Sequence, residues 1–82
     1  MFFVYMLQCN DSTLYTGITN DIEKRLKAHS SGKASRYTRR RLPVKVIYKE
    51  EHPDKSAALK RELQIKRLSR KEKIGLIFGG TE

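Results

Sequence analysis

The first nineteen residues carry apolar positions without a helical period, and one short polar stretch interrupts them. Aromatic and branched residues fill positions 2–9 (FFVYMLQC), which predicts a β-strand. Asn10, Asp11 and Ser12 have the chemistry of a turn. Residues 13–19 (TLYTGIT) predict a second strand, so the two segments together predict an antiparallel hairpin.

The register of this hairpin decides which side chains share a face of the sheet. A three-residue loop pairs Cys9 with Thr13 and places Tyr5 opposite Gly17. Tyr15 then lies diagonally across from Tyr5 on the same face. A four-residue loop would place the two tyrosines on opposite faces, because side chains alternate along a strand. We predict the three-residue loop.

A first helix follows the hairpin. Asn20 as N-cap and Glu23 three residues later resemble a capping box. Ile22 and Leu26 define the buried stripe of this helix, which we expect to end at Gly32. A loop rich in basic residues is expected over residues 30–41.

The second half of the chain predicts a strand and two helices. Residues 42–51 (LPVKVIYKEE) read as a third strand, with Pro43 at its start or at an exposed edge. A helix is expected over residues 55–68. A capping box over residues 69–72 opens a last short helix, which ends at Gly79-Gly80.

These elements predict one α+β domain over residues 1–82. Their order is β-β-α-β-α-α, and the simplest packing is a small three-stranded, mainly antiparallel sheet flanked by helices.

The helix expected over residues 55–68 carries a charge in an unusual place. A helical wheel gives one broad apolar arc that contains Ala58, Leu59, Leu63 and Ile65. Glu62 falls in the middle of this arc, where a solvated charge does not belong. A pair with Lys66, one turn later, would balance the charge but would not explain why both residues are buried. Glu62 is therefore a candidate functional carboxylate.

The charge of the chain indicates a polyanionic partner. The chain has 18 Lys and Arg against 9 Asp and Glu, a formal charge of +9. All the basic residues lie between Lys24 and Lys73, an asymmetry that solubility alone does not require. The surface expected to contact phosphates comprises Lys33, Arg36, Arg39, Arg40, Arg41 and Lys66.

Cysteine usage and hydropathy point to the cytoplasm. Cys9 is the only cysteine, so no disulfide can form within the chain, which fits a reducing compartment. The apolar stretch at residues 2–7 is too short to span a membrane. It also lacks the basic region and cleavage site of a signal peptide.

Several kinds of site are excluded or unsupported. One cysteine and two separated histidines cannot form a zinc cluster, and no P-loop or dinucleotide fingerprint is present. What remains is a set of polar groups that face inward: Tyr5 and Tyr15 on one sheet face, Arg25 and His29 one helical turn apart, and Glu62. Phosphodiester cleavage needs a base, a cation and a metal-binding carboxylate. One carboxylate can suffice for Mg²⁺, whose other ligands are water and substrate phosphate.

The order and spacing of these residues resemble the GIY-YIG nuclease family. Residues 4–6 (VYM) and 15–17 (YTG), whose tyrosines lie ten positions apart, look like the two halves of its signature. The family then has a helix with an arginine, here Arg25, and a later helix with a glutamate, here Glu62. The likeness is greatest to its short stand-alone branch, because residues 25–29 (RLKAH) and 37–39 (YTR) match that branch.

The resemblance implies a role for each residue. Tyr15 would help to deprotonate the attacking water, directly or through His29, and Tyr5 would orient that water. Arg25 would stabilise the charge on the phosphate, and Glu62 would bind one Mg²⁺ or Mn²⁺ ion. Tyr37 and Thr38 would hold phosphate or position the basic loop.

The chain also departs from the excision-repair branch of the family. Ile18 replaces the lysine of those members, and the asparagine that follows their metal-binding helix has no clear counterpart. Fewer substrate contacts would weaken substrate positioning.

The expected function is a metal-dependent endonuclease that acts on nucleic acid, with DNA favoured over RNA, and that selects structure in repair or recombination. The alternative is a non-catalytic basic module that binds nucleic acid and retains a degenerate nuclease pocket. No membrane is expected as a partner. The sequence leaves a protein partner and a weak homo-oligomer open.

Overall fold

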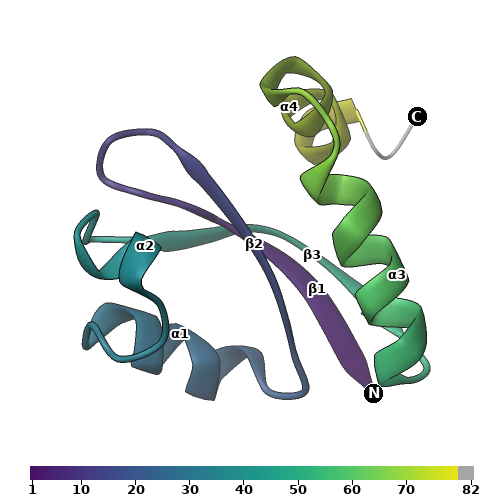
Figure 1. Cartoon of the computed structure of the whole chain (residues 1–82), viewed down its shortest axis with the longest axis horizontal. Helices are drawn as coiled ribbons and strands as arrows, with labels where there is room; N and C mark the ends of the chain where they lie inside the picture. Colours follow the sequence, from purple (N-terminus) through teal and green to yellow (C-terminus); the bar gives the residue numbers. More distant parts are fainter. Residues whose placement is uncertain (80–82) are drawn as a thin grey trace.

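Three antiparallel strands form the sheet in the order β2-β1-β3, and four helices lie against it (Figure 1). The structure is a computed structural model, and it describes residues 1–79. Its elements are β1 (Phe2–Gln8), β2 (Leu14–Thr19), α1 (Ile22–Ser30), α2 (Arg36–Arg39), β3 (Lys45–His52), α3 (Lys55–Lys66) and α4 (Arg70–Gly79). The expected α+β class and sheet are confirmed. The last helix was predicted to end at Gly79-Gly80, and Gly80 lies outside the described residues.

The register of the hairpin is the predicted one. Tyr5 pairs with Gly17, and Leu7 pairs with Tyr15. The amide of Cys9 donates to the carbonyl of Thr13 at 2.9 Å, which closes the three-residue loop. Tyr5 and Tyr15 therefore share one face of the sheet, as the alternation of side chains requires.

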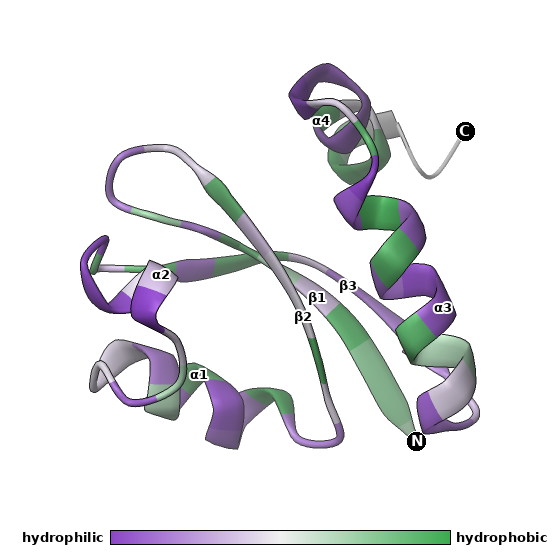
Figure 2. Cartoon of the chain, in the orientation of Figure 1, coloured by the Kyte–Doolittle hydropathy of each residue, from purple (hydrophilic) through white to green (hydrophobic). Residues whose placement is uncertain are grey.

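The central strand β1 is buried on both of its faces. Val4 and Met6 form the main core with Ala58 and Ile65 of α3, and side chains of α4 complete it. The other face of β1 carries Tyr5, which contacts α1. Figure 2 shows this arrangement as a hydrophobic central strand between largely hydrophilic helices.

Helix α1 begins one residue later than predicted. Asp21, and not Asn20, is the N-cap, because its carboxylate accepts from the amide of Lys24 at 3.1 Å. The hydroxyl of Thr19 accepts from the amide of Asp21 and thereby holds the cap in place. The predicted end is confirmed, since the helix stops at Ser30 and Gly32 has a positive φ of 78°.

The segment expected to be a loop over residues 30–41 contains the short helix α2, so that expectation is wrong. The hydroxyl of Ser35 caps α2 by accepting from the amide of Tyr37 at 3.1 Å. The carbonyl of Ser35 accepts from the amide of Arg39 at 3.0 Å. A single turn of helix has too few residues to give a periodic signal in the sequence.

The apolar arc predicted for α3 is only partly buried. Ala58 and Ile65 are fully buried, but Leu59 is 44% exposed and Leu63 is 53% exposed. The reason is that α3 contacts the sheet along a narrow stripe, and the two leucines lie beside it. Glu62 is half-buried, at the margin of the stripe rather than within an apolar surface.

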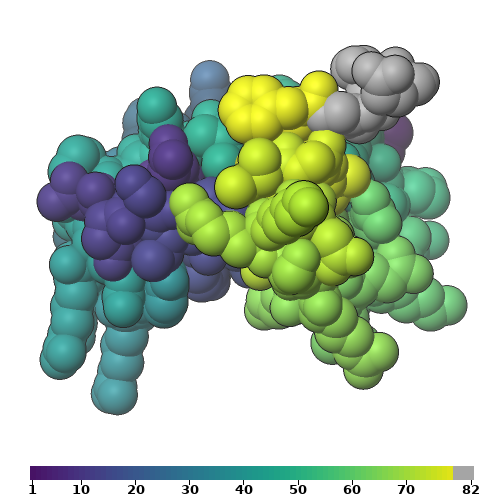
Figure 3. Space-filling model, turned by 90° about the horizontal axis from the view of Figure 1, so that it is seen from above, coloured from purple at the N-terminus to yellow at the C-terminus, as the bar shows by residue number. Residues whose placement is uncertain are grey.

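The remaining boundaries differ from the predictions by a few residues. β3 begins at Lys45, beyond Pro43, and α3 ends at Lys66. The capping box that opens α4 is confirmed, because Ser69 and Glu72 exchange two backbone-to-side-chain hydrogen bonds, at 2.8 and 3.1 Å. α4 lies beside the hairpin end of the molecule, as the view from above shows (Figure 3). Within residues 1–79, no helix has the length and apolar character needed to cross a bilayer.

Candidate active site

The hydroxyl of Tyr5 and the imidazole of His29 meet on the α1 side of the sheet. Tyr5 projects from β1 with only 2% of its surface exposed, and His29, in the last turn of α1, is fully buried. The hydroxyl oxygen lies 2.8 Å from Nε2 of His29, which is a hydrogen-bond distance. This bond directly joins two of the residues that the sequence singled out.

Gly17 allows Tyr5 to lie against the backbone of β2. A Cβ atom at position 17 would lie 2.7 Å from the hydroxyl oxygen of Tyr5 and 3.2 Å from Cε2 of Tyr15. The first distance is shorter than any carbon–oxygen contact that packing allows without movement. Position 17 therefore needs a glycine because of the close approach of the Tyr5 ring.

Tyr15 and Tyr37 extend this contact into an aromatic cluster. The ring of Tyr15 packs edge-on to His29, with 5.2 Å between the ring centroids, and lies 6.5 Å from the ring of Tyr5. The ring of Tyr37, from α2, lies 6.0 Å from the ring of Tyr15, measured between centroids. The hydrogen bond of Nε2 goes to Tyr5, whereas Tyr15 contacts His29 through its ring.

Thr38 holds the second nitrogen of His29. Its hydroxyl oxygen lies 2.8 Å from Nδ1, and its side chain is fully buried. The buried Thr38 hydroxyl cannot reach a phosphate while α2 keeps this position. Of the two roles that the family resemblance implied for Thr38, the geometry supports positioning.

Arg25 places a positive charge beside the Tyr5–His29 pair. Burial lowers the pKa of His29, and the charge of Arg25 lowers it further, so the imidazole is neutral at pH 7. Burial raises the pKa of the Tyr5 phenol; Arg25 opposes this rise, and Tyr15 and Glu62 add to it. Within residues 1–79, Nε of Arg25 is buried without a hydrogen-bond partner, an unfavourable state that a bound oxygen acceptor would relieve.

Glu62 approaches the same group of residues from α3. Its carboxylate pairs with Nζ of Lys66 at 3.2 Å, and its side chain is 18% exposed. Since it contributes to the raised pKa of Tyr5, its charge acts on the site. No group of three or more His, Cys, Asp or Glu residues gathers as a metal cluster within the described part of the chain. The donor set fits Mg²⁺ or Mn²⁺ only in the way the sequence predicts, with Glu62 as the protein ligand and water and phosphate as the others.

The basic residues expected to bind nucleic acid fall into two groups. Arg41 is engaged within the protein: its Nε donates to Asp11 at 3.0 Å, and its guanidinium carbon lies 3.9 Å from the ring centre of Tyr37. Lys66 is paired with Glu62, although half of its side chain is exposed. The exposed basic residues of the segment after α1 are Lys33, Arg36, Arg39 and Arg40.

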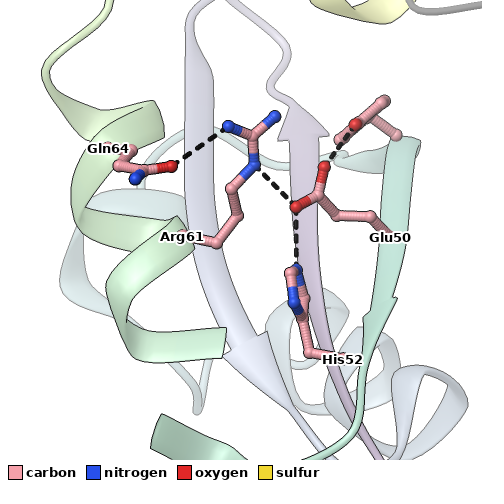
Figure 4. Close-up of polar contacts among 5 residues, drawn as sticks. Glu50, His52, Arg61 and Gln64 are labelled. Atoms are coloured by element: carbon pink, nitrogen blue, oxygen red, sulfur yellow. Dashed lines mark hydrogen bonds and ion pairs between the residues drawn. The ribbon is translucent and has the colours of Figure 1, made fainter. Parts of the chain in front are cut away.

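A polar network that the sequence analysis missed fixes α3 to β3 (Figure 4). Oε1 of Glu50 accepts from Nε of Arg61 at 2.7 Å and from Nε2 of His52 at 2.8 Å, and Oε2 accepts from the hydroxyl of Tyr48. Burial acts to raise the pKa of Glu50, but these three donors outweigh it, and the pKa is lowered. Arg61 directly precedes Glu62, so this network constrains the turn of α3 that carries Glu62. The available signal was the i, i+2 spacing of Tyr48, Glu50 and His52, which places them on one face.

Comparison with known proteins identifies the family of the chain. The profile of the GIY-YIG catalytic domain matches residues 1–74. The chain belongs to the GIY-YIG family. This confirms the resemblance seen in the sequence and places the protein in a family of nucleases, whose substrate class is nucleic acid and whose members generally use a divalent metal.

Relatives within the GIY-YIG family are small proteins of similar length. A UPF0213 protein of Syntrophus aciditrophicus is 54% identical over 81 residues, which cover 98% of this chain and 93% of the relative. A UPF0213 protein of Streptococcus sanguinis is 48% identical over 80 residues, which cover 98% of this chain and 92% of the relative. The solution NMR structure of a UPF0213 protein from Bacillus halodurans is similar with a TM-score of 0.61 and 41% identity, over 94% of this chain and 83% of that one.

Proposed function

We propose that this GIY-YIG protein is an endonuclease that depends on a divalent metal and hydrolyses phosphodiester bonds in DNA. The observation that carries the proposal is the convergence at the Tyr5 hydroxyl. His29 bonds to it, and the charges of Arg25 and Glu62 both act on it. A proton acceptor, a cation and a carboxylate at one point are what hydrolysis of a phosphate ester requires.

The proton path runs through Tyr5. Nε2 of neutral His29 accepts the Tyr5 proton while the Tyr5 oxygen takes a proton from the attacking water. The resulting hydroxide forms a bond to phosphorus as the bond to the leaving oxygen breaks, and solvent protonates the leaving oxygen. The family resemblance gave Tyr15 the proton-accepting role; the bond between Tyr5 and His29 favours Tyr5 for it and leaves Tyr15 to orient the water.

Arg25 and Glu62 act on the charge of the phosphate. The Arg25 guanidinium stabilises the negative charge that develops on the phosphoryl oxygens. Glu62 would hold the Mg²⁺ or Mn²⁺ ion, which when bound neutralises phosphoryl charge and orients the scissile bond. The exposed residues Lys33, Arg36, Arg39 and Arg40 would contact the nucleic-acid backbone without reading bases.

We infer that substrate choice rests on structure, because the exposed basic residues after α1 would contact the nucleic-acid backbone and would not read bases. Branched DNA from repair or recombination is the favoured substrate, in the cytoplasm. RNA is the disfavoured substrate.

A cleavage assay tests the function. Branched, single-stranded and duplex DNA, and single-stranded RNA of the same sequence, are incubated with the protein and Mg²⁺ or Mn²⁺. Glu62→Gln removes the carboxylate without changing its size, and Glu23→Gln, at an exposed position of α1, is the matched control. Products that require metal and disappear only in Glu62→Gln support the proposal. Binding without products in every variant would instead establish the non-catalytic binding module.

A further inference from the structure

The hydroxyl of Thr38 lies between two polar atoms inside the protein. Its oxygen is 2.8 Å from Nδ1 of His29 and 3.3 Å from the carbonyl oxygen of Ser35. The side chain of Thr38 has no exposed surface. Water therefore cannot supply a replacement partner, and the two contacts define how this hydroxyl is used.

The contact with Ser35 points to the nitrogen of His29 that carries the proton. A hydroxyl has one proton to donate, and a carbonyl oxygen can only accept. The Thr38 hydroxyl donates to Ser35, so its lone pair accepts from an N–H at Nδ1 of His29. Because neutral imidazole carries one proton, Nε2 is then bare and accepts from the Tyr5 hydroxyl.

We propose that Thr38 is a positioning residue that holds His29 in the Nδ1–H tautomer, so that Nε2 can receive the Tyr5 proton. The proposal rests on the nuclease function proposed above. In the other tautomer Nε2–H would donate to the Tyr5 oxygen. The Tyr5 proton would then have no acceptor in this arrangement, and the path from water to His29 would be closed.

The local fold holds Thr38 in place for this role. α2 is a single turn, and the carbonyl of Ser35 accepts from both the Arg39 amide and the Thr38 hydroxyl. The carbonyl of Thr38 accepts from the amide of Arg41 at 2.9 Å. Backbone hydrogen bonds thus fix both ends of the turn. The titratable groups that face the His29 ring are Tyr5, Tyr15 and Arg25.

Two substitutions separate the hydroxyl from the shape of the side chain. Thr38→Val keeps the branched shape but removes the acceptor for Nδ1–H, which favours the Nε2–H tautomer because Tyr5 can still accept. Thr38→Ser keeps the hydroxyl. Thr16→Val is the matched control, because Thr16 is also buried and its hydroxyl has no hydrogen-bond partner within residues 1–79.

The decisive measurement is the tautomer of His29 by long-range proton–nitrogen NMR correlation, in the protein without DNA or metal. The chain has two histidines, so His52 serves as the internal reference. We expect Nδ1–H in the wild type, Thr38→Ser and Thr16→Val, and Nε2–H in Thr38→Val. An Nε2–H tautomer in the wild type, or the same tautomer in Thr38→Val as in the wild type, would overturn the proposal.

Kinetics give the second readout. Thr38→Val should lower kcat for DNA cleavage at least tenfold with KM changed less than about twofold, and Thr38→Ser should restore most of kcat. An equal loss in Thr38→Ser, with the native tautomer, would show that Thr38 does not act through its hydroxyl. If the wild type shows the Nδ1–H tautomer and cuts no nucleic acid, the nuclease proposal fails while the tautomer assignment stands.

Discussion

The hydroxyl of Tyr5 and Nε2 of His29 share a hydrogen bond of 2.8 Å, and this bond ties the central strand to the first helix. Tyr15, on the same face of the sheet, touches His29 only through its ring. The two tyrosines of the family signature are therefore not equivalent. Replacing each by phenylalanine should separate their contributions.

Tyr5→Phe removes the hydroxyl that connects water to His29. We expect kcat to fall by about 10²-fold or more, the range typical for loss of general acid–base catalysis. Tyr15→Phe should cost less, because it leaves the bond between Tyr5 and His29 in place. Steady-state cleavage kinetics of both variants provide the measurement. A larger loss in Tyr15→Phe would reassign the proton path to Tyr15, as the family resemblance first implied.

Gly17→Ala should displace Tyr5, because the added Cβ would lie 2.7 Å from its hydroxyl oxygen and 2.8 Å from Cζ. We expect a loss of about 1–3 kcal/mol in the free energy of unfolding, as is usual for overpacking, together with loss of cleavage. Gly75→Ala is the control: nothing lies near its Cβ position, and alanine favours a helix by about 0.5–1 kcal/mol. Chemical denaturation measures both. Unchanged stability and activity in Gly17→Ala would show that Tyr5 does not lie against β2.

The buried, neutral state of His29 predicts how stability depends on pH. The pKa of His29 is lowered from 6.5 in the folded protein, so the unfolded chain binds more protons as the pH falls through 6.5. The free energy of unfolding should therefore decrease from pH 7.5 to pH 5.5. His29→Gln should flatten this dependence, although it lowers stability overall. Urea titrations at several pH values test this, and parallel curves for the two proteins would contradict it.

Glu50→Gln should loosen α3 from the sheet. The half-buried Glu50 carboxylate accepts hydrogen bonds from three donors, and the amide of Gln would accept them less well. The charge of Arg61 would also lose its counterion. Together these effects should lower the free energy of unfolding by about 1–3 kcal/mol. Because Glu62 follows Arg61, more Mn²⁺ should also be needed for half-maximal cleavage. Glu51→Gln, at the exposed neighbouring position, controls for the charge change. If Glu50→Gln and Glu51→Gln need the same Mn²⁺ concentration for half-maximal cleavage, the Glu50 network contributes to stability but does not position Glu62.

Arg36, Arg39 and Arg40 should account for part of the affinity for nucleic acid. Each phosphate contact that is lost lowers the slope of log K against log salt by about 0.9 for duplex DNA. Changing all three to glutamine should flatten the slope, which binding measurements at several salt concentrations report. Arg41→Gln should act mainly on stability, since Asp11 and Tyr37 already engage Arg41. A flatter salt slope in Arg41→Gln, with an unchanged slope in the triple variant, would show that Arg41 leaves Asp11 when DNA binds.

The sequence predicted the sheet and the hairpin register because both depend on short-range rules. Turn chemistry set the loop length, and the alternation of side chains then placed Tyr5 and Tyr15 on one face. The place of His29 on the helix predicted only that it lies beside the buried stripe; its link to a tyrosine was implied by the family resemblance. Which tyrosine it contacts depends on how α1 packs, and no local pattern encodes that.

The parts that were missed depend on contacts distant in the sequence. The burial of Thr38 follows from a one-turn helix that gives no periodic signal, and the pairing of Arg41 with Asp11 spans thirty residues. The exposure of Leu59 and Leu63 shows that a helical wheel gives the direction of a face but not the width of the surface that covers it.

The two-sided burial of β1 limits how the length of this hairpin can change during evolution. Inserting one residue within β1 or β2 would shift every following side chain of that strand to the opposite face. Side chains of the candidate active site would then point into the core, and core side chains would point into the site. A strand with one solvated face would tolerate part of that exchange, but here both faces are occupied. Relatives should therefore gain or lose single residues only in the turn at residues 10–12, and within the strands only in pairs.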